Sequence, residues 1–172
     1  MPDTPHFRIG TRGSDLALWQ AHYVRDVIAT AGGTSEIIVL STQGDREQVQ
    51  SFEKLEGKGF FTKEIEDALL ENRIDIAVHS HKDLETQQPQ GLSIVAVPAR
   101  ASQRDALLIR EPRHTAGPWL PLPQGAIVGT SSVRRRDQLL LLRPDLRIEA
   151  LRGNVPTRVK RLQEGLYDAI VL

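Results

Sequence analysis

Three turns of one design recur along the chain, and they limit it to folds in which strands alternate with helices. In each turn an apolar strand ends at Gly or Ser residues, a helix begins directly afterwards, and arginine lies beside it; the turns are residues 10–14, 129–136 and 151–158. Backbone N–H groups at the start of a helix attract anions, and arginine adds directed donors. Each turn taken singly could be an ordinary capped helix with solvated arginines. Their recurrence favours a polyanionic ligand.

The spacing of apolar residues predicts an α/β fold. In the first half we expect strands at residues 7–10, 36–41 and 92–97 and a helix at 61–72. An earlier helix is expected to begin after Ser14, a natural N-cap, and to end at Gly32 and Gly33. Its apolar positions repeat with helical spacing at Leu16, Trp19, Tyr23, Val27 and Ala31.

A second series of strands and helices follows. Strands are expected at residues 106–109, 126–129, 147–151 and 168–172. One helix should begin near Val133 and must end before Pro144, because the residue before a proline disfavours helical geometry. Another helix should carry Pro156 in its first turn and end at Gly165.

The charge changes sign between the two halves. Residues 1–99 carry 9 Lys+Arg against 15 Asp+Glu, a balance of −6, and residues 100–172 carry 13 against 7, a balance of +6. The change coincides with a short polar stretch. We therefore predict a first domain at residues 1–98, a hinge at 99–103 and a second, anion-attracting domain at 104–172. The polar, glycine-containing residues 42–59 are interpreted as a mobile flap.

The composition argues against several classes of function. A net charge of +0 argues against bulk electrostatic binding to nucleic acid or to a membrane. The absence of cysteine excludes disulfides, a thiolate nucleophile and a cysteine-based zinc site in these residues. The chain has neither an apolar run long enough to cross a bilayer nor the layout of a signal peptide, so a cytoplasmic location is expected.

The stretch at residues 74–83 begins as an apolar strand and ends in His81, Lys82 and Asp83. Ligands of open α/β sheets bind beyond the carboxyl ends of the strands, so Lys82 and Asp83 are candidate functional residues. A solvated turn is the alternative interpretation. His79 and His81 could share a strand face and bind metal, but no third ligand is evident, so we predict no metal site.

Together, these motifs resemble the porphobilinogen deaminase family, also called the hydroxymethylbilane synthases. The matching segments, in the family's order, are IGTRGSDLALWQA from Ile9, STQGD from Ser41, GKGFFTKEIEDALL from Gly57, DIAVHSHKD from Asp75, VGTSSVRRR from Val128 and LRGNVPTR from Leu151. The resemblance implies two β/α domains of the kind found in type II periplasmic binding proteins. They would meet at a cleft with Lys82 and Asp83 on one side and arginines on the other.

The resemblance also implies an activity in tetrapyrrole (heme) biosynthesis. Members of the family condense four porphobilinogen units head to tail into hydroxymethylbilane. Each round releases ammonia and gives an electrophilic azafulvene, which the free α-carbon of the growing pyrrole chain attacks. The implied partners are porphobilinogen and the linear pyrrole chain, and the full-length protein is expected to be a monomer. The alternative is a non-catalytic two-domain anion-binding module, which would not need a Lys-Asp pair positioned against pyrrole rings.

The family's motifs assign roles to particular residues. Asp83 is the implied catalytic residue, which hydrogen-bonds pyrrole N–H groups and stabilises developing positive charge. Phe61 is implied to lie at the mouth of the active site. The residues implied to bind the carboxylates of the cofactor or growing chain are Arg12, Ser14, Lys82, Arg104, Ser132, Arg134, Arg135, Arg152 and Arg158, with Thr130 and Ser131 as weaker candidates.

Two departures from the family pattern accompany the match. Family members hold a dipyrromethane cofactor by a thioether to a cysteine in a third, C-terminal domain, and these 172 residues contain no cysteine. We therefore expect the chain to be truncated before that domain, to hold no covalently bound cofactor and to be inactive by itself. The second departure is Leu84-Glu85-Thr86, where many relatives have a proline.

Overall fold

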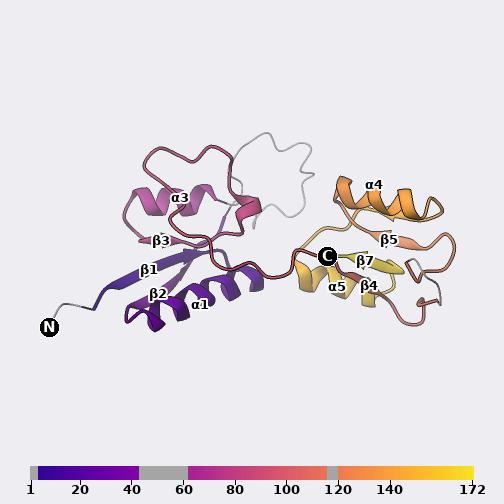
Figure 1. The fold of residues 1–172 in the computed structure, drawn as a ribbon, viewed down its shortest axis with the longest axis horizontal. Helices are drawn as coiled ribbons and strands as arrows, with labels where there is room; N and C mark the ends of the chain where they lie inside the picture. The colour runs from indigo at the N-terminus through magenta and orange to yellow at the C-terminus, as the bar shows by residue number, and fades with distance from the viewer. Residues whose placement is uncertain (1–3, 43–61, 116–119) are drawn as a thin grey trace. The chain divides into compact units, whose positions relative to one another are not determined.

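A computed structural model describes residues 4–42, 62–115 and 120–172. Their contacts divide the chain into two compact units, Met1–Val97 and Pro98–Leu172 (Figure 1). Both units combine helices with strands, which confirms the α/β class expected from the sequence. No helix in the described part of the chain is long and apolar enough to cross a membrane.

The first unit is built on a small parallel sheet. Its strands are β1 (His6–Thr11), β2 (Thr34–Val39) and β3 (Ile76–Ala77), arranged in the order β2-β1-β3. The helices are α1 (Asp15–Thr30) and α3 (Lys63–Leu70), and a short 3-10 turn, η2, spans His81–Asp83. Ile9 of β1 pairs with Ile37 on one side and Ile76 on the other. Parallel pairing brings the carboxyl ends of β1 and β3 to the same edge of the sheet.

The ends of α1 follow from local chemistry. The Ser14 hydroxyl accepts a hydrogen bond from the Ala17 N–H at 3.4 Å, which confirms Ser14 as the N-cap. Gly32 follows the helix with φ +84°, a conformation that glycine adopts without steric cost. The helix is thus bounded where the sequence indicated.

The apolar stripe of α1 that is most visible in the sequence lies on the outer face of the helix. Leu16, Trp19, Tyr23 and Val27 are 51%, 63%, 41% and 52% exposed, and the rings of Trp19 and Tyr23 stack at a centroid distance of 6.1 Å. The buried residue of α1 is Ala21, whose small side chain permits a close approach to the sheet. Helical spacing therefore identified the helix but not its buried face.

The strand predicted at residues 92–97 is wrong, because the segment forms no strand in the structure. Val95 is 85% exposed, and Leu92 donates its N–H to the Pro89 carbonyl in a local turn at 3.1 Å. A strand exists only when its backbone pairs with a neighbour, and no described strand pairs with this segment. Its β-branched composition alone did not make it a strand.

A bidentate ion pair joins β1 to the start of the DIAVHSHKD segment. Arg8 donates from Nη2 to Asp75 Oδ1 at 2.7 Å and from Nε to Oδ2 at 3.0 Å, and its backbone N–H donates to Oδ2 at 2.8 Å. The Asp75 N–H donates in return to the Arg8 carbonyl at 2.9 Å. The first residue of this segment is therefore structural, since it fixes the register of β3 against β1.

The Arg8–Asp75 pair predicts a loss of stability in acid. Hydrogen bonds from the Arg8 side chain and backbone lower the pKa of Asp75 from 3.8 to about 2. Because the folded-state pKa is depressed, the stabilisation is complete above about pH 4 and is lost as the pH falls toward 2. The side chains are 34% and 37% exposed, so solvent screening keeps the effect modest. We expect Asp75→Asn to flatten the melting-temperature profile across this window, and circular dichroism profiles that superimpose would contradict the assignment.

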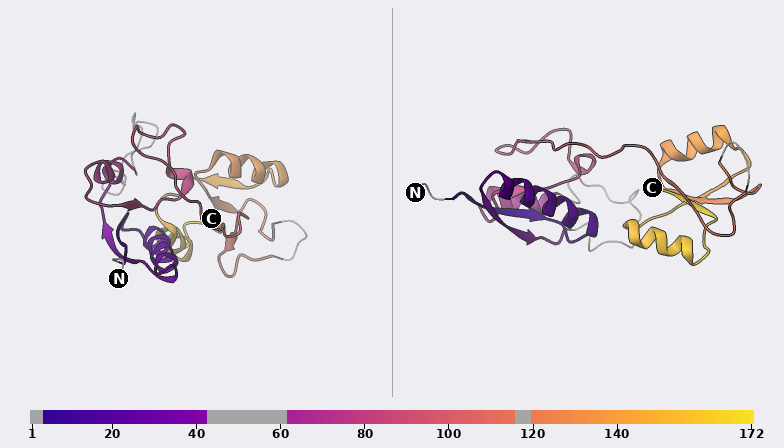
Figure 2. Two further views of the ribbon diagram at one scale, coloured as in Figure 1. Left: turned by 60° about the vertical axis from the view of Figure 1, so that its left-hand side comes forward. Right: turned by 60° about the horizontal axis from the view of Figure 1, so that its bottom comes forward.

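The second unit has a four-stranded mixed sheet in the order β4-β7-β5-β6. The strands are β4 (Leu107–Ile109), β5 (Ile127–Gly129), β6 (Arg147–Glu149) and β7 (Ala169–Val171). β4 runs antiparallel to β7, whereas the other pairs are parallel. The two helices, α4 (Val133–Leu142) and α5 (Val155–Gln163), cover opposite faces of the sheet (Figure 2).

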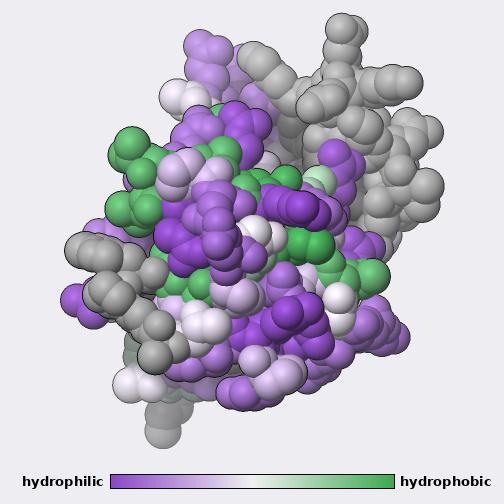
Figure 3. Space-filling model, turned by 90° about the vertical axis from the view of Figure 1, so that its right-hand side faces the viewer, coloured by the Kyte–Doolittle hydropathy of each residue, from purple (hydrophilic) through white to green (hydrophobic). Residues whose placement is uncertain are grey.

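The core of the second unit follows the alternation of strand side chains. Ala169 and Val171 pack with Leu139 of α4, whereas Ile170 packs with Leu162 of α5. Successive residues of one strand face opposite sides, so a short apolar strand serves both layers. On the surface, the face of the molecule drawn in Figure 3 is mostly hydrophilic, with hydrophobic residues in small separate groups.

Candidate active site

The turn after β3 holds Asp83 in a fixed backbone geometry. The Val78 N–H donates to the Gly10 carbonyl at 3.0 Å, which continues the pairing with β1 beyond the strand. The Asp83 N–H then donates to the Ser80 carbonyl at 2.9 Å, and the Ser80 hydroxyl donates to Gln20 Oε1 of α1 at 3.1 Å. Asp83 is therefore positioned by the sheet and by α1.

Asp83 is half-buried, and its carboxylate makes no hydrogen bond or ion pair with any residue in the described ranges. Lys82 beside it is exposed. The carboxylate oxygens consequently remain available as acceptors for a ligand donor, in a turn that is otherwise hydrogen-bonded. This arrangement matches the position at which α/β sheets bind ligands.

His79 lies in the same electrostatic environment as Arg12 and Asp83. Burial lowers the pKa of His79, the charge of Asp83 opposes this shift, and the charge of Arg12 adds to it. Its Nε2 atom is buried and has no hydrogen-bond partner within the described residues. The sequence interpretation weighed His79 only as a metal ligand and did not select it as a residue of the active site. Its position four residues before Asp83, just after the carboxyl end of a strand, is the sequence feature that could have indicated a place near the candidate site.

In the second unit, Ser131 joins the turns that follow β5 and β6. Its hydroxyl donates to the Leu151 carbonyl at 2.9 Å and accepts from the Leu151 N–H at 3.1 Å. Both functions of the hydroxyl are used, so the structure gives Ser131 a bridging role in place of a free donor. Because Arg152 follows Leu151 directly, this bridge also fixes the start of the turn at residues 151–158.

The neighbouring hydroxyls, those of Thr130 and Ser132, organise the turn at residues 129–136. Thr130 is buried, and its Oγ1 accepts from the Ser132 N–H at 3.2 Å. The Ser132 hydroxyl accepts from the Arg135 N–H at 3.4 Å and caps α4. Each hydroxyl acts as an acceptor here and retains its own hydrogen for donation.

Arg134 and Arg135 converge on Asp105, a residue that sequence reasoning did not select. Arg134 donates to both Asp105 oxygens at 3.0 and 3.3 Å, and Arg135 donates from Nε and Nη2 to Asp105 Oδ1 at 3.1 and 2.9 Å. These contacts lower the pKa of Asp105. Arg158 donates to the Gly153 carbonyl at 2.7 Å, and burial together with the charge of Arg135 lowers the pKa of Arg158. Three of the predicted arginines, Arg134, Arg135 and Arg158, thus interact with one another or with one shared carboxylate.

The other predicted residues are placed less tightly. Arg104 is exposed, and its backbone N–H donates to the Ser102 hydroxyl at 3.3 Å. Arg152 is half-buried, and its carbonyl accepts from Arg161 at 3.3 Å. Phe61 lies outside the described residues, as does almost all of the predicted flap. The described residues hold no group of three or more His, Cys, Asp or Glu that could bind a metal ion.

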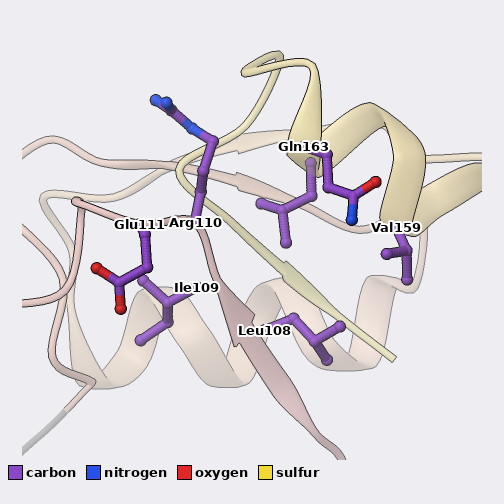
Figure 4. Close-up of a pocket in the computed structure, with 7 residues that line it drawn as sticks. Leu108, Ile109, Arg110, Glu111, Val159 and Gln163 are labelled. Carbon is purple, nitrogen blue, oxygen red and sulfur yellow. The ribbon is translucent and has the colours of Figure 1, made fainter.

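The second unit also has a pocket of about 460 Å³, and its lining is made of other residues than the candidate site. The pocket is lined by Leu108, Ile109, Arg110, Glu111, Val159, Leu162 and Gln163 (Figure 4). The guanidinium of Arg110 turns away from the apolar lining, donates to the Tyr167 carbonyl at 3.3 Å and pairs with Asp168 at 3.5 Å. None of the predicted binding residues lines this pocket.

Comparison with known proteins agrees with the motifs. The sequence profile of the family described as "Porphobilinogen deaminase, dipyromethane cofactor binding domain" matches residues 7–172. The chain belongs to the porphobilinogen deaminase family. A porphobilinogen deaminase of Acidithiobacillus ferrooxidans is 52% identical over 171 residues, which are 98% of this chain and 55% of that protein. One from Sulfurimonas denitrificans is 47% identical over 95% of this chain and 52% of its own length.

The resemblance stated from the motifs is therefore confirmed at the level of the family. The chain spans about half the length of the curated porphobilinogen deaminases it matches. Among solved structures, an ancestral cyclohexadienyl dehydratase aligns over 97% of this chain and 65% of its own, with a TM-score of 0.44 and 11% identity. A likeness of that size supports no conclusion about the fold.

Proposed function

We propose that this chain provides the catalytic carboxylate and the arginine cluster of a porphobilinogen deaminase, an enzyme that condenses four porphobilinogen units into hydroxymethylbilane and releases ammonia. The observation that carries the proposal is the state of Asp83, a half-buried residue whose backbone is fixed by a hydrogen bond and whose carboxylate is unpaired among the described residues. The proposal includes two domains of the type II periplasmic binding protein kind, a monomeric full-length protein and a cytoplasmic location.

Asp83 would act on the pyrrole nitrogen. A carboxylate accepts a hydrogen bond from the pyrrole N–H, and its negative charge stabilises the positive charge that develops on the ring as ammonia departs. The same oxygen can take up the proton released when a new carbon–carbon bond restores the aromatic ring. Lys82 would bind a substrate carboxylate beside it. Arg12 would add a second cation on the same edge of the sheet.

The arginines of the second unit would bind the acetate and propionate groups that each pyrrole carries. Guanidinium groups bind carboxylates through paired N–H donors, and both Arg134 and Arg135 sit in the first turn of α4, where backbone N–H groups add to the attraction. Arg158, Arg152 and Arg104 would serve other carboxylates of the chain. The hydroxyls of Thr130 and Ser132 retain hydrogens for the same purpose.

The residues present also fit the carboxylates of a dipyrromethane cofactor. Arg135 is only 20% exposed and Arg158 is half-buried, so both side chains are held against the protein rather than free in solvent, which supports binding of the cofactor's carboxylates. When bound, dipyrromethane supplies the primer to which pyrrole units are joined. This chain contains no cysteine and therefore offers no thiol for its covalent attachment.

An anion-binding module without chemistry is the second candidate, supported by the same arginine cluster. The two functions differ in what happens to porphobilinogen. We expect the natural full-length protein to release one ammonia for each porphobilinogen consumed and to form a linear tetrapyrrole, which an ammonia assay and mass spectrometry would detect. Binding of porphobilinogen without ammonia release would favour the module and refute the proposed enzyme.

A further inference from the structure

The guanidinium groups of Arg134 and Arg135 contact the same carboxylate, although the two residues point in different directions from the helix. Consecutive residues of an α-helix project roughly 100° apart around its axis. In α4 the two guanidinium groups nevertheless meet the same carboxylate, with the shortest contact of each to Asp105 at 3.0 and 2.9 Å. Their convergence therefore depends on a residue outside the helix, 29 and 30 positions earlier in the chain.

Asp105 is itself attached to the sheet of the second unit. The next residue, Ala106, donates its N–H to the Leu172 carbonyl and accepts from the Leu172 N–H, both at 3.0 Å. Arg135 reaches the same region, because its Nη1 donates to the Val171 carbonyl at 3.1 Å. Asp105 is therefore fixed by backbone hydrogen bonds of the residue that follows it, so its carboxylate can hold two long side chains in place.

Asp105 leaves one edge of the Arg134 guanidinium group unused, the edge formed by Nε–H and the second hydrogen of Nη2. Arg134 Nη1 and Nη2 bind Asp105, and Nη1 also donates to Gln138 Oε1 at 3.2 Å. Its Nε–H makes no hydrogen bond with a described residue. Since a guanidinium group can bind carboxylates along two edges, Asp105 can hold one edge while the Nε edge binds a ligand.

We propose that Asp105 is a positioning residue that gathers Arg134 and Arg135 into one site for ligand carboxylates. The identity of that ligand as a pyrrole acetate or propionate rests on the proposed function, but the gathering does not. Two effects of Asp105 oppose each other. Its negative charge repels an anionic ligand, whereas its hydrogen bonds remove the cost of ordering two flexible side chains at the moment of binding.

The direction in which glutarate affinity changes when Asp105 is replaced shows which effect is larger, charge repulsion or the ordering of the arginines. We expect Asp105→Asn to weaken the binding of glutarate, a simple dicarboxylate probe, by roughly two- to fivefold, although the site becomes more positive. Binding would be followed in the full chain by NMR titration of the Arg134 and Arg135 Nε–Hε signals. Unchanged or tighter binding would overturn the proposal, as would a wild-type chain whose signals do not respond to glutarate.

A matched control lies on the same helix. Asp137 pairs with Arg136 at 2.9 Å, both side chains are at least half exposed, and Asp137→Asn removes the same charge without touching Arg134 or Arg135. We expect it to leave glutarate binding unchanged or slightly tighter, and a loss equal to that of Asp105→Asn would refute positioning. Asp105→Glu keeps the charge and should restore part of the affinity if the variant binds through the same two arginines.

Asp105→Asn could also act by unfolding the unit, and its thermal transition distinguishes this case. A folded variant with weaker glutarate binding supports the proposal. If Asp105→Asn unfolds, Asp105→Glu decides: a folded Asp105→Glu variant that binds glutarate no more tightly than wild type supports positioning, and tighter binding would overturn it. The two proposals can fail separately. If Asp105→Asn weakens glutarate binding but the natural full-length protein releases no ammonia from porphobilinogen, this inference stands and the proposed function is rejected.

Discussion

Replacing Asp83 with asparagine in the natural full-length protein is expected to slow ammonia release from porphobilinogen by about 10²- to 10⁴-fold, the range of a lost catalytic acid–base group. Asparagine has nearly the same size and keeps one oxygen as an acceptor, but it carries no negative charge and cannot take up a proton. Binding of porphobilinogen should change much less, because the arginines that would bind its carboxylates are intact. The measurement is single-turnover ammonia release alongside the dissociation constant.

The control for Asp83 is a residue in the same segment. Glu85 lies two positions later, and Glu85→Gln removes the same charge while its backbone carbonyl still accepts from Gln88 at 2.6 Å. We expect Glu85→Gln to retain nearly full turnover. Equal losses in both variants would assign the effect to the general field of the loop, and normal turnover in Asp83→Asn would remove Asp83 from the mechanism.

The sequence predicted those parts of the fold that depend on neighbouring residues. Ser14 caps α1, the helix predicted to begin near Val133 follows the Ser132 cap, and Gly165 follows α5 with φ +84°. Each of these signals is a hydrogen bond or backbone conformation completed within about four residues. The segment at 92–97 failed because strand formation depends on a distant partner, which residue propensity does not supply.

The candidate site shows the same division between local and distant information. The motifs identified Arg134 and Ser131, but not the residues that they contact. Ser131 contacts Leu151 at a separation of 20 residues, and Arg134 contacts Asp105 at a separation of 29. These contacts are set by sheet order, since β5 lies between β6 and β7, and β7 pairs in turn with β4, which follows Asp105. A motif thus indicates which side chains are present at a turn, whereas the topology determines which of them already make hydrogen bonds to other parts of the protein.

Arg143, just after α4, is a structural cation of the second unit. Its Nε and Nη2 bind the two oxygens of Asp145 at 2.7 and 2.8 Å. Its remaining donors reach the carbonyls of Leu120 and Leu122 at 3.2 Å and of Pro123 at 3.3 Å. The Arg143 side chain and the Gly125 N–H together hold the pKa of Asp145 well below its usual range. One side chain therefore satisfies three loop carbonyls and a carboxylate.

Removing Arg143 should consequently destabilise the protein more than removing any exposed arginine of α4. We expect Arg143→Ala to lower the melting temperature by roughly 5–15 °C, because the loop carbonyls and the Asp145 carboxylate lose their shared donor. Arg143→Lys keeps the charge but cannot supply the same set of donors, so most of the loss should remain. Arg136→Ala is the matched control, since Arg136 pairs with adjacent Asp137 and both are at least half exposed. Differential scanning calorimetry would test this order, and equal melting temperatures for Arg143→Ala and Arg136→Ala would show that the loop is held by other contacts.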